Sequence, residues 1–271
     1  MNPRLTLLLL AAPALVLAGE PGPVSPLEDN SFLIEEAYNQ EPGVVQQMGT
    51  FLRGRGGAWV ASFTQEWPVP GQEHQLSYTL TYGRAGADGA RGLGDILVNY
   101  RYQAVYQEDR VAFAPRLSAV IAGSNADSGA SYRGLGLQGM LPVSTTLTPW
   151  LVTHSNLGIT WIPSGRSGDA QAEFLVLALG QSFVWLLAPR FNVLLETLWL
   201  STDLRSGGTT RREQALLVSP GVRWGIDLPG DAQVVLGLAA PLGVGPSAGE
   251  RSVFLYLSFE APFWRPTAPP P

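Results

Sequence analysis

Residues 111–121 read VAFAPRLSAVI, and this stretch indicates the fold of the whole chain. Its odd positions, among them Val111 and Leu117, are apolar, whereas its even positions include Arg116 and Ser118. Alternation with a period of two places successive side chains on opposite faces of a β-strand. The stretch is therefore predicted to be a strand with one apolar face and one polar face.

The same alternation recurs between Gly- and Pro-containing breaks, and it predicts about twelve strands. Their approximate ranges are 44–53, 58–67, 75–84, 94–106, 111–122, 131–142, 148–162, 171–187, 189–204, 213–228, 232–243 and 251–264. Residues 171–187 are apolar on both faces, and by pattern alone they fit a buried helix equally well. The neighbouring segments favour a strand there.

Short and longer connections alternate between these strands. The tight set comprises 68–71, 107–110, 142–146, 188–189 and 228–231. The longer, Gly- and Ser-rich set comprises 85–92, 123–130, 163–169, 206–212 and 243–250, with 54–57 as a short exception. Short periplasmic turns and longer outer loops are typical of an even-stranded transmembrane antiparallel β-barrel with both termini in the periplasm.

The first 18 residues have the parts of a secretory signal. Arg4 is basic, residues 5–17 are apolar, and Val16-Leu17-Ala18 fits the small-residue cleavage rule. No later segment offers about 18 apolar residues in a row, so no membrane-spanning helix is expected. The domain organisation is therefore predicted as follows: signal peptide 1–18, acidic N-terminal leader 19–43, β-barrel 44–264, Pro-rich tail 265–271.

The composition narrows the class of protein. Charged residues make up 14% of the chain and apolar residues 45%, and there is no cysteine. Disulfides, a lipoprotein anchor and thiolate metal sites are thereby excluded. The net charge is −5 and no basic tract occurs, so nucleic acid is not an expected partner. A large soluble β-sandwich with sparse surface charge is the alternative, but the signal and the periodicity together favour an outer-membrane barrel.

Aromatic residues near the predicted strand ends support this orientation, since Trp and Tyr prefer the membrane interfaces. Trp67, Tyr106, Trp150, Trp185 and Trp264 fall near periplasmic ends, and Trp59, Tyr82 and Trp161 near outer ends. With the apolar face outward, polar side chains line the lumen. They are Glu66, Asp95, Asn99, Arg101, Arg116, Gln138, His154, Arg190, Asn192, Glu196, Arg223 and Glu260.

These charges suggest a pore with a transverse field that favours amphipathic or anionic solutes. We expect selectivity to depend above all on Asp95, Arg101, Arg116, Arg190, Glu196 and Arg223. In the alternative interpretation, the charges pair across a narrow lumen and fill the barrel.

The leader contains six acids and precedes the first basic residue of the mature chain, Arg53. Its acids are Glu20, Glu28, Asp29, Glu35, Glu36 and Glu41, and a short helix is expected at 31–38. An acidic segment tethered beside a lumen that contains arginines is predicted to enter it as a plug. A periplasmic tail outside the lumen is the alternative.

The run His154-Ser155-Asn156 raises the possibility of a hydrolase. In a strand, however, His154 and Ser155 point to opposite faces and cannot share a proton. No Gly-x-Ser-x-Gly elbow and no metal-ligand cluster occurs, so neither catalysis nor a cofactor nor a metal is expected.

Two stretches resemble a known family. DNSFLIEEAYNQE at 29–41, followed by GVVQ at 43–46, is similar to its N-terminal signature, and GLGDI at 92–96 resembles its strand-four motif. Weaker likeness is found in FAPRL at 113–117 and NLG at 156–158. The family is the outer-membrane β-barrel family named for a MetA pathway of phenol degradation. This resemblance implies a transporter of aromatic or other hydrophobic compounds. The chain departs from a common barrel ending, because residues 265–271 follow the terminal aromatic.

The sequence thus predicts an outer-membrane channel or transporter for passive passage of small solutes. Its expected partners are outer-membrane lipids, a small-molecule solute and the barrel assembly machinery. The alternative is a closed barrel with a structural or adhesive role, although the outer loops are short, Gly-rich and poor in the aromatics that protein-binding surfaces favour.

Overall fold

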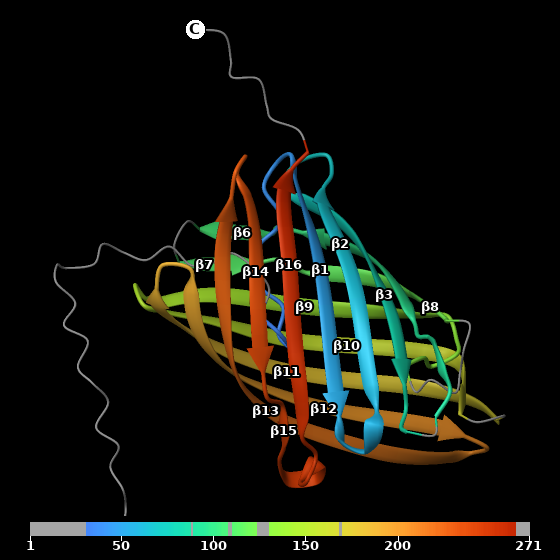
Figure 1. Cartoon of the computed structure of the whole chain (residues 1–271). Coiled ribbons are helices and arrows are strands. Elements are labelled where there is room, and N and C mark those ends of the chain that lie inside the picture. The colour runs from blue at the N-terminus through green and yellow to red at the C-terminus, as the bar shows by residue number, and fades with distance from the viewer. Residues whose placement is uncertain (1–30, 88, 108–109, 124–129, 168–169, 264–271) are drawn as a thin grey trace, which may run out of the picture.

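The computed structural model describes residues 31–87, 89–107, 110–123, 130–167 and 170–263. The predicted signal peptide, the first part of the leader, Trp264 and the tail lie outside these residues. The described chain is nearly all strand and forms one closed antiparallel β-barrel, as predicted (Figure 1).

The barrel wall has twelve strands, several of which are interrupted. The elements are β1 Val44–Gly54, β2 Trp59–Pro68, β3 His74–Arg84, β4 Arg91–Leu93, β5 Ile96–Tyr102, β6 Val105–Gln107, β7 Val111–Phe113, β8 Arg116–Ile121, β9 Gly136–Thr148, β10 Leu151–Ser167, β11 Ala170–Ala188, β12 Phe191–Ser206, β13 Thr209–Leu228, β14 Ala232–Ala239, β15 Leu242–Gly243 and β16 Ser252–Pro262, with short 3₁₀ turns η1 Arg55–Gly57 and η3 Gly245–Ser247. Elements β4 to β6 form one wall strand, β7 and β8 another, and β15 extends β14. Pairing of β16 with β1, from Val44↔Pro262 to Gly54↔Ser252, closes the ring.

The two faces of the wall have opposite chemistry, as the alternation predicts. In β8 the side chains of Arg116 and Ser118 are buried, whereas Leu117 is 58% exposed. In β16 Tyr256 is buried, and Leu255 lies on the outer face. An apolar exterior around a polar interior is the pattern of a barrel whose solvent outside is lipid.

Aromatic side chains gather at both ends of the outer wall. At the end where β1 meets β2, the ring of Trp59 lies 5.9 Å from that of Phe51 and 5.6 Å from that of Tyr82. At the opposite end Tyr106 and Trp150 are exposed. This distribution agrees with two membrane interfaces.

One predicted turn is wrong. Residues 142–146 were expected to form a tight connection, but they lie within β9, and the chain turns at Pro149 and Trp150 instead. Proline lacks an N–H and favours a turn, yet the following threonines are β-branched and fit a pleated surface. Pairing with β10 therefore continues from Leu137 to Thr148.

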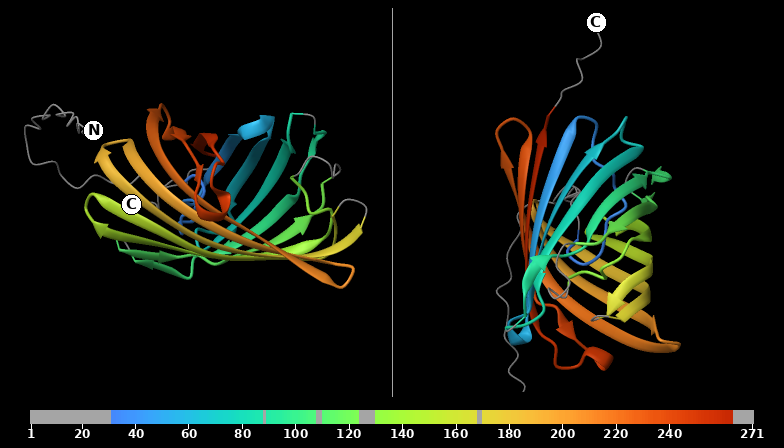
Figure 2. Two further views of the ribbon diagram at one scale, coloured as in Figure 1. Left: turned by 90° about the horizontal axis from the view of Figure 1, so that it is seen from below. Right: turned by 90° about the vertical axis from the view of Figure 1, so that its right-hand side faces the viewer.

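Two predicted loops are also wrong, because β10 to β13 extend further than the apolar pattern indicates. Residues 163–167 belong to β10, and 209–212 belong to β13. Here ion pairs join directly opposed residues, with Asp203 of β12 bound by Arg212 and Glu173 of β11 facing Arg205. Asp203 and Arg205 are two residues apart and share one face of β12, so charged residues take the place of apolar ones there and the apolar pattern does not mark the extension. Figure 2 shows it projecting beyond the rest of the wall.

Candidate functional site

Residues 31–40, here called the strap, lie inside the barrel (Figures 1 and 2). The predicted helix at 31–38 is wrong, because these residues have only bends and irregular backbone. Their N–H groups donate to side chains of the wall rather than to carbonyls within the strap. The strap is thus fastened by the polar lumen face of the strands.

The first anchor is a carboxylate on β12. Glu196 accepts hydrogen bonds from three successive backbone N–H groups, those of Phe32 (3.0 Å), Leu33 (3.0 Å) and Ile34 (3.2 Å). Glu196 is fully buried. The wall thus supplies one carboxyl group that accepts from three successive amides of the strap.

Neutral side chains hold the rest of the strap backbone. Asn156 of β10 accepts from the N–H of Glu35 (2.7 Å) and donates to its carbonyl (2.9 Å), as a neighbouring strand would. The remaining acceptors are Ser144 for Ala37, Gln103 for Asn39 and Gln75 for Gln40.

Apolar side chains of the strap pack where the wall has glycine. Phe32 lies against the rings of Phe254 and Tyr256, at 5.5 and 5.6 Å. A Cβ added at Gly237 would overlap the ring of Phe32, because it would lie closer to Cε1 and Cζ than van der Waals contact allows. Ile34 fills the corresponding space at Gly180. The wall is therefore shaped around the strap.

The carboxylate of Glu36 points toward the wall at β10 and β13. It accepts a hydrogen bond from Nη1 of Arg223 on β13 at 3.0 Å, and its Oε1 lies 3.5 Å from Nε2 of His154. Arg223 also donates to Asn192 (3.0 Å). All four side chains are buried. The pair is thus withdrawn from any solute.

The carboxylate of Glu35 faces the other way. Arg116 of β8 binds it with two groups, Nε to Oε2 at 3.0 Å and Nη2 to Oε1 at 2.5 Å, and Arg101 of β5 approaches Oε2 at 3.4 Å. Burial raises the pKa of Glu35, but the charges of Arg116 and Arg101 outweigh it and hold the pKa below the ordinary value. Glu35 is therefore ionised at neutral pH.

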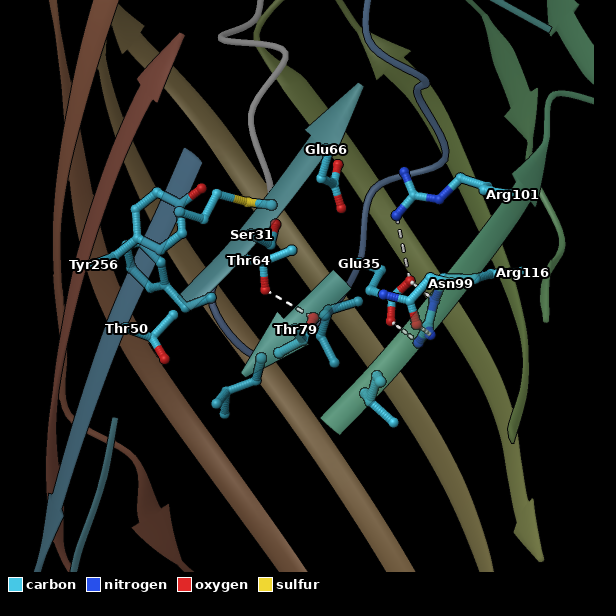
Figure 3. A pocket seen from close by; sticks show the side chains of 15 residues that line it. Ser31, Glu35, Thr50, Thr64, Glu66, Thr79, Asn99, Arg101, Arg116 and Tyr256 are labelled. Carbon is cyan, nitrogen blue, oxygen red and sulfur yellow. Dashed lines mark hydrogen bonds and ion pairs between the residues drawn. The ribbon is translucent and has the colours of Figure 1, made fainter. Parts of the chain in front are cut away.

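A cavity of about 260 Å³ adjoins this ion pair (Figure 3). One side is the strap, and the opposite side is formed by β1, β2, β3, β5, β8 and β16. Three threonine hydroxyls line it on adjacent strands, from Thr50, Thr64 and Thr79. The strap covers the wall of β9 to β13 and leaves this cavity on the other side of the lumen.

Nine of the residues predicted to line the lumen are buried on its inner face. They are Glu66, Asp95, Asn99, Arg101, Arg116, His154, Asn192, Glu196 and Arg223. Of these, Glu66, Asn99, Arg101 and Arg116 line the cavity. Asp95 instead accepts from the N–H of Tyr132 (3.0 Å), which follows β8 in the chain. Glu260, on β16, is half-buried and opposite Gln46.

Arg190 does not belong to this set. It occupies the two-residue turn between β11 and β12 with a φ of 64°, and its side chain binds Asp227 at the surface. The sequence predicted this turn at 188–189, with Arg190 in the following strand, and the structure places the turn one residue later, at 189–190. A left-handed conformation is uncommon for arginine, and no local signal predicts it.

Sequence reasoning missed the neutral residues that fasten the strap. Ser144, Asn156, Ser182, Gln75 and Gln103 contact it, yet none carries a charge. In the sequence, these residues are marked only as polar residues at positions that the alternation assigns to the lumen face. The predicted lumen residues Gln138 and His154 do lie there, where Gln138 accepts from Arg116.

A Ser–His–acid series occurs in the lumen but has no room for a substrate. Ser144 Oγ lies 2.7 Å from His154 Nδ1, and His154 faces Glu36. The side chains are buried, and Ser144 also accepts from the N–H of Ala37. As predicted, Ser155 points outward, where it binds Gln181. A nucleophile needs space for a reacting carbonyl, and the strap fills it.

Within the described ranges no helix has the length and apolar character needed to span a membrane. The same part of the chain holds no group of three or more His, Cys, Asp or Glu side chains suited to a metal ion.

No family model matches the sequence, and no curated protein matches it. Its fold is similar to the COG4313 outer membrane channel from Pseudomonas putida F1, with a TM-score of 0.61 and 11% identity over 88% of this chain and 99% of that chain. It is also similar to the NanC porin, with a TM-score of 0.55 and 13% identity over 79% and 98% of the two chains. A closed barrel that is apolar outside and polar inside is built for an outer membrane, and this chain is a bacterial outer-membrane β-barrel with the fold of channel proteins.

Proposed function

We propose that the protein is an outer-membrane channel for passive passage of small amphipathic solutes, in which the strap narrows the lumen. One observation carries the proposal: the strap is attached by side-chain contacts, and a cavity lies beside it. A segment that served only as core would be expected to pair as a strand. The strap instead leaves one side of the lumen lined by charged side chains and threonine hydroxyls.

The solute class follows from the lining of the cavity. Met48, Leu97 and Tyr256 offer apolar surface, and Arg101, Arg116 and Glu66 offer charge. Such a lining suits a molecule with an apolar body and a polar group. Aromatic compounds are within this class, which agrees with the resemblance to the phenol-degradation barrels; membership of that family is part of the proposal. Selectivity is assigned to the charged cavity residues.

The test is single-channel conductance of the refolded mature protein in a planar bilayer, with and without residues 19–40. We expect small discrete steps from the intact protein and a several-fold larger conductance after deletion, because the lumen then loses its strap. Deletion of the tail, residues 265–271, is the matched control and leaves conductance unchanged.

The alternative is a closed structural or adhesive barrel. The close fit of Phe32 and Ile34 into glycine positions favours it, since such packing stabilises a filled lumen. Silent bilayers from both folded proteins would establish this alternative and exclude the channel.

A further inference from the structure

We propose that the cavity binds a small carboxylate-bearing solute, and that its carboxylate displaces Glu35 from Arg116 and Arg101. This inference rests on the proposed channel function and specifies which solute loosens the strap.

The two arginines form a carboxylate site that the strap itself occupies. Two nitrogens of Arg116 donate to the two carboxylate oxygens of Glu35. Any other carboxylate can accept the same pair of hydrogen bonds. Its remaining nitrogen donates to Asn99 at 2.9 Å, so the guanidinium group is fixed in place. Arg101 donates to the carbonyl of Tyr38 (3.0 Å), and its buried Nε has no hydrogen-bond partner among the described residues. The site is therefore preorganised and not fully used.

Displacement by a neutral molecule is unfavourable. It would leave two buried guanidinium groups without their carboxylate, and a buried charge without its partner destabilises the folded state. An entering carboxylate keeps both arginines paired. Glu35 is the more exposed member of the pair, with 27% of its side chain accessible against 8% for Arg116. It is therefore the group that can leave.

The cavity limits the size of the solute and sets the chemistry of its body. Its volume of about 260 Å³ is below the roughly 300–1,000 Å³ of pockets for drug-sized ligands. The lining also includes Phe32, Leu97 and Tyr256. Figure 3 shows Tyr256 on the opposite side of the pocket from the two arginines. A single ring or short chain bearing one carboxylate fits both the volume and the lining.

Displacement of Glu35 acts directly on the strap. The backbone N–H and carbonyl of Glu35 are the groups held by Asn156. Movement of its side chain out of the arginine site therefore pulls on the middle of the strap. Binding of the solute and loosening of the strap are in this way linked through one residue.

The experiment is calorimetric titration of the refolded mature protein in detergent with benzoate and with benzamide, which have the same shape and differ in charge. Glu35→Gln removes the competing carboxylate, and we expect benzoate affinity to rise about tenfold or more, which corresponds to at least about 1.4 kcal/mol. Benzamide affinity stays unchanged. Asp227→Asn is the matched control, since it removes a carboxylate paired with an arginine, Arg190, at the surface and away from the strap. It leaves benzoate affinity within about twofold. Arg116→Gln, with folding checked by heat-modifiable migration, loses benzoate binding.

Equal benzoate affinity in the original protein and Glu35→Gln would overturn the inference, as would an equal gain for benzamide. The channel proposal fails separately. If conductance rises on strap deletion but Glu35→Gln does not strengthen benzoate binding, the site is rejected and the channel is kept. If Glu35→Gln strengthens benzoate binding but the barrel stays silent in the bilayer, the channel is rejected and the site is kept.

Discussion

Glu35 and Glu36 are adjacent in the chain, and each binds an arginine of the wall, but the two ion pairs differ in their surroundings. Glu36 and Arg223 are 4% and 1% exposed, whereas Glu35 borders a cavity. The two adjacent side chains diverge, because Glu35 reaches Arg116 of β8 and Glu36 reaches Arg223 of β13. One face of the strap is thereby fixed to β13, and the other is presented to the lumen. The comparison suggests that the first pair holds the strap and the second responds to solutes.

The largest expected effect comes from the buried pair. Glu36→Gln leaves Arg223 without its buried carboxylate, and we expect the free energy of unfolding to fall by about 3 kcal/mol. Glu35→Gln should cost only about 1.5 kcal/mol, because water reaches its side chain. Urea-unfolding midpoints of refolded protein in detergent measure both. Equal losses would show that the two faces of the strap are equivalent.

An intermediate effect is expected where the strap packs on glycine. Gly237→Val would press a side chain into the ring of Phe32, and overpacking costs about 1–3 kcal/mol. We expect the N-terminal part of the strap to shift and conductance to rise. The control is Gly49→Val on the outer face of β1, where the nearest atom to an added Cβ is 3.9 Å away. If both variants conduct alike, the apolar anchor contributes nothing to closure.

The smallest effect is that of pH on the exposed pair. Burial raises the pKa of Glu35, but the charges of Arg116 and Arg101 lower it by more, so the pKa lies below 4.5. The ionised Glu35 carboxylate therefore stabilises the folded state fully above pH 4.5. This stabilisation is lost as the pH falls through the lowered pKa. The contribution of Glu35 should therefore leave conductance constant from pH 8 to pH 5 and raise it below pH 4.5. Glu35→Gln should lack that component; an identical acid response in the variant would assign it to another group.

The sequence predicted the barrel better than it predicted the strand ends. In β8 and β16 the alternation assigned both faces correctly, because apolar residues face lipid at every second position. It failed at 142–146 and at the extension of β10 to β13, where threonines and cross-strand ion pairs replace the apolar pattern. Pairing partners, rather than local composition, decide where such strands end.

The candidate site was predicted in its parts. The acids of the leader and the arginines of the lumen were identified separately, and the plug hypothesis brought the two groups together. Which carboxylate binds which arginine was not predictable, and neither was the role of Asn156 or Ser144. Neutral side chains that hydrogen-bond to backbone have no charge pattern to reveal them.

By itself the sequence determined the strand periodicity, the apolar exterior and the acidic character of the segment before β1, because each of these depends only on residues close together in the chain. The tertiary structure alone decided where that segment lies. Glu36 reaches Arg223 across 187 positions, and Ala37 reaches Ser144 across 107. Such contacts form only when closure of the barrel by β16 and β1 brings distant strands around one lumen. The physical reason is that alternation is local, whereas the fit of the strap depends on the whole wall.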